Sequence, residues 1–333
     1  MRAFHHAAAV LLCAAVLLGC GQNVLNAPRP APYVDLPRLR GSDRIELQLE
    51  RGKPNANPDT DTAEKLEPWI GRAADAVSAY YGQFPVAQTR MLVEQTDGNG
   101  VQWARTFARS GFVVRVGMGK QTSASQLASD WMLTHEFVHL ALPTLPDEHD
   151  WLQEGAATYV EPVARAQAGQ LTPEQVWAEF AHGMSRGLPG PRDRGLDNTS
   201  SWPRTYWGGA MFCLVADIEI RKQTANRYGL RDALRGILAA GGTLDHRWSI
   251  RETLVAGDRA VGVPVLTQMY DQWRAAPVQV DLEALWHQLG VQREGRVVVL
   301  DDTAPLADVR RAITAQPVTA AADDDPSSPL QAD

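Results

Sequence analysis

The sequence lacks several features that would each point to a particular class of protein. It has no excess of basic residues, because 32 Lys and Arg stand against 39 Asp and Glu and leave a net charge of −7. This balance argues against a nucleic-acid partner. It contains no internal repeat and no apolar run of the roughly 20 residues that span a bilayer. With 44% hydrophobic and 21% charged residues, the chain can bury a sizeable core.

The N-terminus carries a short apolar run over residues 8–18. Its length is typical of a secretory signal peptide and too small for a transmembrane helix. The run ends in LLGC at 17–20, which resembles a bacterial lipobox. This pattern predicts a signal peptide over 1–19, cleavage before Cys20 and attachment of lipid to the Cys20 thiol. Because Gly21 stands where an inner-membrane retention signal has aspartate, we expect an outer-membrane lipoprotein of the cell envelope that faces the periplasm.

Cysteine is scarce, with three among 333 residues. Once Cys13 leaves with the signal peptide and Cys20 is acylated, Cys213 has no partner for an intramolecular disulfide. Cys213 lies in the apolar stretch 210–215, which favours a buried structural thiol over a nucleophile.

A pair of histidines stands four positions apart in the sequence HEFVH, as His135 and His139. Positions i and i+4 lie on one face of a helix, so both imidazoles can bind one metal ion while Glu136 lies beside it. Helical spacing of apolar residues, a capping serine at 123 or 125 and the following Pro143 predict one helix from Ser125 to Leu142. A turn and a second helix from near Trp151 follow.

A catalytic zinc ion takes three protein ligands and keeps one position open. Glu154, in the first turn of the second helix, can face His139 across a short turn and is the ligand we predict. The third histidine of metzincins would fall at Leu145, which excludes that scheme. His149, in the turn itself, stays open as a rival ligand.

Longer segments then resemble the gluzincins, the zinc peptidases with an H-E-x-x-H pattern and a downstream glutamate. Residues 151–161 (WLQEGAATYVE) are similar to the W-L-x-E-G-x-A-[ST]-Y-x-E run of aminopeptidase N relatives. Residues 206–224, with Y-x-x-G-A and then D-x-x-I-R, are similar to the glycyl aminopeptidase family and its peptidase MA-like domain, and a weak similarity reaches 301–307. The resemblance covers residues 120–315.

Two departures limit what the resemblance implies. Only 14 residues separate His139 from Glu154, fewer than is usual in gluzincins. The G-A-M-E-N strand motif of aminopeptidase N is absent, so recognition of a free N-terminus is not carried over. The choice between aminopeptidase and endopeptidase therefore stays open, as do the natural substrate and the oligomeric state.

The predicted function is that of a zinc-dependent peptidase of the cell envelope, acting on peptides or proteins. His135, His139 and Glu154 would hold Zn²⁺, and Glu136 would act as general base and then as general acid. The resemblance implies that Tyr206 stabilises the oxyanion. The alternative is a non-catalytic zinc-binding lipoprotein that uses the peptidase fold for binding or scaffolding, although metal binding alone does not require Glu136.

Several residues have two readings. Tyr206 is either the oxyanion donor or a packed anchor. Thr158 either hydrogen-bonds a metal ligand or bonds the backbone one turn back. Glu161 either braces the site or is a solvated charge. Four tryptophans near the site either wall a substrate pocket or pack in the core: Trp131, Trp151, Trp202 and Trp207.

The expected fold class is α+β, a zincin-like peptidase with the active-site helix between a small mixed-sheet N-terminal lobe and a helical C-terminal lobe. The predicted domains are a tether over 20–42, a catalytic domain over 43–315 divided at 142/143, and a disordered acidic tail over 316–333. We expect strands over 44–50, 88–94, 111–117 and 296–300. We expect further helices over 63–81, 172–184, 206–223, 228–240, 264–274, 281–289 and 306–314. The strand Phe112–Val116 is expected to pair with extended substrate, and the loop Gly187–Arg204 to overhang the cleft.

Overall fold

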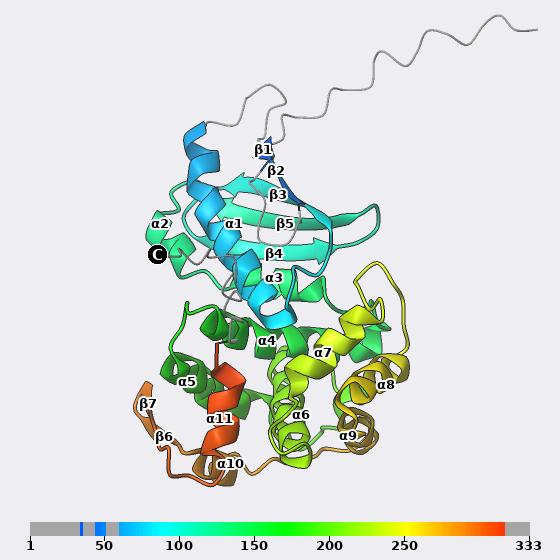
Figure 1. Cartoon of the computed structure of the whole chain (residues 1–333). Helices are drawn as coiled ribbons and strands as arrows, with labels where there is room; N and C mark the ends of the chain where they lie inside the picture. Colours follow the sequence, from blue (N-terminus) through cyan, green and yellow to red (C-terminus); the bar gives the residue numbers. More distant parts are fainter. Residues whose placement is uncertain (1–33, 36–43, 51–59, 317–333) are drawn as a thin grey trace, which may run out of the picture.

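The computed structural model describes residues 34–35, 44–50 and 60–316, and it shows a sheet lobe joined to a helical lobe (Figure 1). The strands of the sheet are β1 (Val34–Asp35), β2 (Arg44–Glu50), β3 (Gln88–Thr96), β4 (Val101–Phe107) and β5 (Phe112–Gly119). Their order is β1-β2-β3-β5-β4, with β2, β3 and β5 parallel and the two edge strands antiparallel. The predicted α+β class with a small mixed sheet is confirmed.

The helical part surrounds the long central helix α4 (Figure 1). The helices of the described chain are α1 (Thr60–Tyr81), α2 (Ala124–Ala128), α3 (Met132–His139), α4 (Asp150–Gln167), α5 (Pro173–Gly183), α6 (Gly209–Gln223), α7 (Leu230–Ala239), α8 (Ile250–Val261), α9 (Val265–Trp273), α10 (Leu282–Leu289) and α11 (Ala307–Thr314). Helix α1 lies across the sheet (Figure 1). A hairpin of β6 (Val291–Glu294) and β7 (Val297–Leu300) completes the helical part. Among the residues described, no helix is both long and apolar enough to cross a membrane.

The two lobes share one hydrophobic core. In α1, Leu66, Ile70 and Val77 recur at helical spacing and are at most 1% exposed. They join Val93 of β3 and Val116 of β5 in the same cluster of buried side chains. Burial of apolar surface on this scale holds the sheet against the helices, which fixes the position of α3 between them (Figure 1).

The metal-pattern helix is shorter than predicted. The chain forms two helices, α2 and α3, where one helix over Ser125–Leu142 was expected, although Ser123 does cap α2 as predicted. The break lies at Asp130, whose carboxylate accepts hydrogen bonds from Trp69 Nε1 at 2.9 Å and from the main-chain N–H of Leu133 at 3.2 Å. A contact to α1 therefore starts a new helix one turn before the first histidine.

The prediction that Phe112–Val116 forms the substrate-binding edge of the sheet is wrong. Phe112–Val116 belongs to β5, which lies inside the sheet between β3 and β4. The edge strand is β4, which was not predicted. Its residues alternate between exposed and half-buried, as in a strand with one covered face, and this weak pattern hid it in the sequence.

Helix α4 packs against α6 with almost no separation. A Cβ on Gly155 would lie 2.3 Å from the Cα of Gly209, and one on Gly209 would lie 1.9 Å from the main-chain oxygen of Trp151. Glycine is required at both positions because any side chain would overlap the facing backbone. This contact sets α6, and the turn before it, against the first turn of α4.

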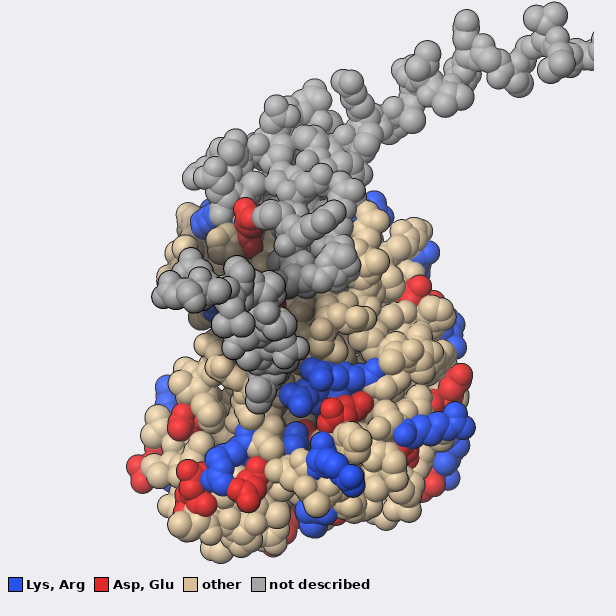
Figure 2. Space-filling model, in the orientation of Figure 1, with Lys and Arg blue, Asp and Glu red and all other residues tan. Residues whose placement is uncertain are grey.

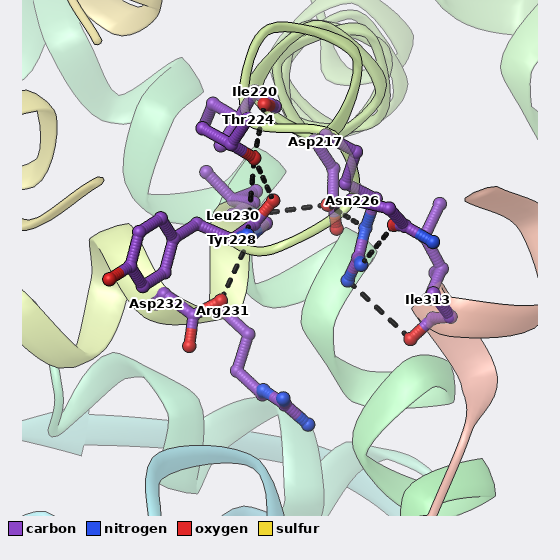
Figure 3. Close-up of polar contacts among 12 residues, drawn as sticks. Asp217, Ile220, Thr224, Asn226, Tyr228, Leu230, Arg231, Asp232 and Ile313 are labelled. Atoms are coloured by element: carbon purple, nitrogen blue, oxygen red, sulfur yellow. Dashed lines mark hydrogen bonds and ion pairs between the residues drawn. The ribbon is translucent and has the colours of Figure 1, made fainter. Parts of the chain in front are cut away.

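The D-x-x-I-R motif is structural (Figure 3). Asp217 of α6 is 2% exposed and accepts three hydrogen bonds, from Arg221 Nε at 2.7 Å, from Tyr159 Oη at 2.7 Å and from the N–H of Leu230 at 3.0 Å. Arg221 also donates to Asn226 Oδ1 at 3.0 Å. The network joins α4, α6 and the start of α7.

The remaining predictions divide three ways. The other expected helices and strands are present, with ends shifted by a few residues, whereas α8 and β6 were not foreseen. The predicted tether contributes the two residues of β1. The signal peptide, Cys20 and the tail from 317 onward lie outside the described residues, so these features, like the domain boundaries, stay predictions. Figure 2 shows acidic and basic side chains interspersed over one face of the molecule.

Candidate metal centre

Three side chains from two helices converge on one point. His135 and His139 lie on one face of α3, and Glu154 lies in α4. One donor atom from each residue lies within 4.8 Å of the other two. Glu154 Oε2 is 3.2 Å from His135 Nε2 and 3.6 Å from His139 Nε2. The structure thus brings the three predicted ligands together.

The spacing of these atoms suits a tetrahedral ion. Donor atoms about 2.0–2.1 Å from one tetrahedral zinc ion lie roughly 3.4 Å from one another. The two distances measured to Glu154 Oε2, 3.2 and 3.6 Å, fall on either side of that value. Two imidazoles and one carboxylate are also a donor set that zinc takes in catalytic sites. The residues present therefore fit zinc.

A short turn of ten residues, 140–149, holds the two helices together. Thr144 fixes it to the loop before α8, because its N–H donates to His246 O at 2.8 Å and its hydroxyl donates to Leu244 O at 2.6 Å. Gln153 Nε2 donates to Pro143 O at 3.2 Å. The small separation of His139 from Glu154 in sequence is accommodated by this anchored turn.

Burial and charge pairing compete at the three converging side chains. Burial alone would raise the pKa of Glu154, but hydrogen bonds and charge from His135 and His139 hold this pKa well below its usual range. Burial prevails at His135 and lowers its pKa, whereas Glu154 and Glu136 outweigh burial at His139 and raise its pKa. An ionised Glu154 and a neutral His135 are forms that bind a cation, and His139 would release its proton when one binds.

Glu136 lies beside the three ligands and is 9% exposed. The hydroxyl of Thr106 donates to Glu136 Oε2 at 2.7 Å and lies 2.9 Å from the main-chain oxygen of the same residue. Thr106 belongs to the edge strand β4, so the sheet positions this carboxylate. Sequence reasoning missed Thr106, since no motif marks it and the strand itself was not foreseen.

Tyr206 lies next to the metal ligands, as predicted. It occupies a single π-helical turn, Arg204–Gly208, that leads into α6. Such turns are rare and are frequent at functional sites. Its ring stacks on His135 at 6.1 Å between centroids. Burial and the charges of Glu154 and Glu136 raise its pKa well above the usual value, so the phenol keeps its proton.

The structure places the other candidate residues as follows. His149 lies outside the converging group of donors, and its Nδ1 is 3.2 Å from Asp197 Oδ1. Neither reading of Thr158 holds, because its hydroxyl is buried with no hydrogen-bond partner within the described part of the chain. Glu161 is not a solvated charge, since it is 3% exposed and paired with Arg165 at 2.8 Å.

Two cavities meet at the metal centre. The smaller, of about 400 Å³, runs along β4 and is lined by Arg105, Thr106, Glu136 and the three ligands among others. The larger, of about 520 Å³, shares His135 and Tyr206 with it. Trp131, Trp202 and Trp207 line the larger cavity, whereas Trp151 packs in the core. The loop Gly187–Arg204, expected over the cleft, contributes Trp202 to this wall.

Comparison with known proteins identifies the fold. No family model matches the chain, and no curated protein matches it in sequence. An aminopeptidase N family protein from Idiomarina loihiensis superposes with a TM-score of 0.56 at 15% identity, over 78% of this chain and 49% of that one. An M1 zinc metallopeptidase from Deinococcus radiodurans gives 0.45 at 20% identity over 76% and 52%. Yeast LTA4 hydrolase gives 0.49 at 12% identity over 75% and 40%.

The first of these matches confirms the predicted zincin-like fold and agrees with the resemblance to gluzincins. The chain spans about half the length of the solved structures that it matches, or less.

Proposed function

We propose that this chain is a zinc-dependent peptidase with His135, His139 and Glu154 as metal ligands. The observation that carries the proposal is the convergence of these three donors within 4.8 Å, with a fourth residue, Glu136, buried beside them and held by Thr106. A site that only stored a metal ion would need no such carboxylate. The arrangement is that of a hydrolase.

Each residue of the site has a distinct role in peptide hydrolysis. The chemistry that zinc supplies when bound is polarisation of the scissile carbonyl and a lowered pKa for water. Glu136 takes the proton of the attacking water and delivers it to the leaving amine. The Thr106 hydroxyl keeps the carboxylate of Glu136 in one orientation. The phenol of Tyr206, which stays protonated, donates a hydrogen bond to the developing oxyanion.

The edge strand β4 supplies the binding surface for the substrate backbone. Among the described strands it pairs with β5 alone, and residues 104–107 line the smaller cavity beside the metal ligands. An extended peptide can add to this edge through main-chain hydrogen bonds, which explains how substrates of varied sequence would be held. The lengths of the peptides released on hydrolysis would distinguish an enzyme that removes terminal residues from one that cleaves within chains.

The test combines metal analysis with peptide hydrolysis on the full-length chain. We expect one zinc per chain, hydrolysis of a mixed peptide library by the wild type, and a loss of activity of roughly 10²-fold or more in Glu136→Gln, with zinc retained. The matched control is Glu148→Gln, an exposed carboxylate in the turn between the helices. One zinc without cleavage by either protein would favour a non-catalytic binding protein, and absence of zinc would overturn the ligand assignment.

We further propose that the protein is a lipoprotein of the cell envelope, anchored through lipid on Cys20. The support is the lipobox-like LLGC at 17–20 and the short apolar run before it. Replacing Cys20 with Ala should move the protein from the membrane fraction to the soluble fraction. A variant that stays with the membrane would contradict the anchor.

A further inference from the structure

The larger cavity beside the metal centre is a separate chamber of about 520 Å³. It lies between α3, α4 and α5, and it shares only His135 and Tyr206 with the smaller cavity along β4. A volume of this size accommodates one large side chain and water. Because His135 and Tyr206 line both cavities, a molecule bound at the metal centre can place a group in this chamber.

Four aromatic rings form a continuous wall of the chamber. Trp131 meets His135 edge-on at 5.7 Å, His135 stacks on Tyr206 at 6.1 Å, and Tyr206 stacks on Trp202 at 5.1 Å between ring centroids. The two tryptophans at the ends are 47% and 59% exposed. Exposed indole faces attract cations as well as apolar surface.

The opposite side of the chamber carries carboxylates. Glu161 of α4 is buried and paired with Arg165 at 2.8 Å. Glu179 of α5 also lines the chamber, and in the described part of the chain no hydrogen bond or ion pair engages it. Glu179 is exposed to the chamber, and burial together with the charge of Glu179 raises the pKa of Glu161. In the described structure Arg165 bonds Glu161 and leaves Glu179 without a bonded cation.

Two further groups complete the lining. The hydroxyl of Thr158 is buried without a hydrogen-bond partner in the described residues. The second cation, Arg186, lies over the ring of Trp207 at 5.7 Å. Arg186 does not pair with either glutamate in the described structure, so Glu179 is the carboxylate of this lining that an entering cation would meet without a bonded arginine.

We propose that this chamber receives a basic side chain, arginine or lysine, of the peptide substrate, with its stem along the aromatic wall and its cation at Glu179. The inference rests on the proposed peptidase function, of which it names the substrate class. A neutral side chain would remove water from Glu179 without replacing its hydrogen bonds, which is unfavourable. An acidic side chain would meet Glu161 and Glu179 directly.

The test measures binding and does not depend on turnover. Full-length Glu136→Gln protein is titrated with alanine hexapeptides that carry one arginine, lysine, citrulline or glutamate, and binding is followed by tryptophan fluorescence. Citrulline keeps the shape of arginine and removes its charge. We expect the arginine peptide to bind at least about tenfold more tightly than the citrulline peptide. Adding Glu179→Gln should abolish this preference, whereas adding Glu174→Gln, an exposed residue at the start of the same helix, should preserve it.

The outcomes separate this proposal from the peptidase function. Equal affinity for arginine and citrulline, a preference that survives Glu179→Gln, or tighter binding of glutamate would each overturn the basic subsite. Wild-type hydrolysis of the same peptides is then measured. Preferred binding of the arginine peptide without hydrolysis would support the basic subsite and refute the peptidase function. Hydrolysis without a preference for arginine would support the peptidase function and refute the basic subsite. The citrulline comparison in the protein with Glu179 intact decides the matter even if the Glu179 variant fails to fold.

Discussion

At the scale of single residues, Thr106 is the contact that joins the sheet to the chemistry. Its hydroxyl is 2.7 Å from Glu136 Oε2. We predict that Thr106→Val lowers kcat by about tenfold or more with little change in KM, because a hydrogen bond to a charged group is lost while binding surface is kept. Steady-state kinetics on a peptide substrate would measure both constants.

The conservative variant separates positioning from folding. Thr106→Ser retains the hydroxyl and should keep most of the activity, and both variants should bind one zinc ion. An equal loss of activity in the serine and valine variants would mean that the methyl group, and not the hydrogen bond, is what matters.

The pKa of the Cys213 thiol provides a test of the buried electrostatics of α6. It is 2% exposed, and burial together with the charge of Asp217 raises the pKa of its thiol. An unfolded thiol loses its proton near pH 8.5 while the native thiol keeps it, so this group makes the free energy of unfolding fall as pH rises above that value. Between pH 9 and 10 we predict that the free energy of unfolding falls more steeply in the wild type than in Cys213→Ala. The difference between the two slopes should be up to about 1.4 kcal/mol per pH unit.

Urea unfolding at several pH values would measure the two slopes, and only their difference matters because the Ala variant also leaves a cavity. In the native protein the thiol should also resist alkylation at pH 8 to 9 and react on unfolding. Parallel slopes, or rapid alkylation of the native state, would contradict the buried-thiol assignment.

At the scale of elements, α4 and α6 meet backbone to backbone at Gly155 and Gly209. A Cβ on Gly155 would lie 2.3 Å from Gly209 Cα. We predict that Gly155→Ala destabilises the fold by at least about 2 kcal/mol, since backbone and not a flexible side chain blocks the added methyl. Because Glu154 is the adjacent residue, zinc affinity should fall as well.

The control for this prediction is Gly190→Ala, where an added Cβ meets nothing within 4 Å and φ is not positive. Thermal or urea unfolding of both variants, with zinc titration, provides the comparison. Similar stability of the two variants would show that α6 moves away freely, and the close helix contact would not be what fixes the Tyr206 turn against Glu154.

The elements that carry the metal ligands could be predicted because their signals are local. The spacing of His135 and His139 needs only one helical face, and the apolar strand β5 stands out by composition. The break at Asp130 could not be predicted, since it depends on Trp69, 61 residues earlier in the chain. Strand β4 could not be predicted either, and with it Thr106, because a half-covered edge strand has little pattern of its own.

Helix α8 was also not predicted, but unlike strand β4 it has clear boundary signals in the sequence. Ser249 caps its N-terminus by accepting from the N–H of Glu252 at 3.1 Å, and Gly262 ends it in the left-handed conformation with φ of 74°. Both residues are typical helix boundaries. The apolar face between them has Ile250, Leu254 and Val261 buried.

At the scale of the whole molecule, the metal site depends on how several distant segments assemble. β4 provides Thr106, α3 and α4 provide the ligands, and the π-helical turn before α6 provides Tyr206. The buried network at Asp217 links α4, α6 and α7 beneath this site.

That network yields a prediction for global stability. Asp217 is 2% exposed and accepts from Arg221, Tyr159 and the N–H of Leu230. We predict that Asp217→Ala costs about 3–5 kcal/mol, because it leaves the Arg221 guanidinium buried without its carboxylate and removes acceptors from two other donors. Glu219→Ala on the same helix, which removes a surface pair with Lys222, should cost less than about 1 kcal/mol.

Urea unfolding of the two variants, followed by far-UV circular dichroism, measures both losses. A double variant, Asp217→Ala with Arg221→Met, removes the buried cation together with its partner and should recover part of the loss. If Asp217→Ala were no more harmful than Glu219→Ala, the helices would be held by apolar packing alone. The D-x-x-I-R motif would then need a role outside the fold, which its burial between α4 and α7 does not favour.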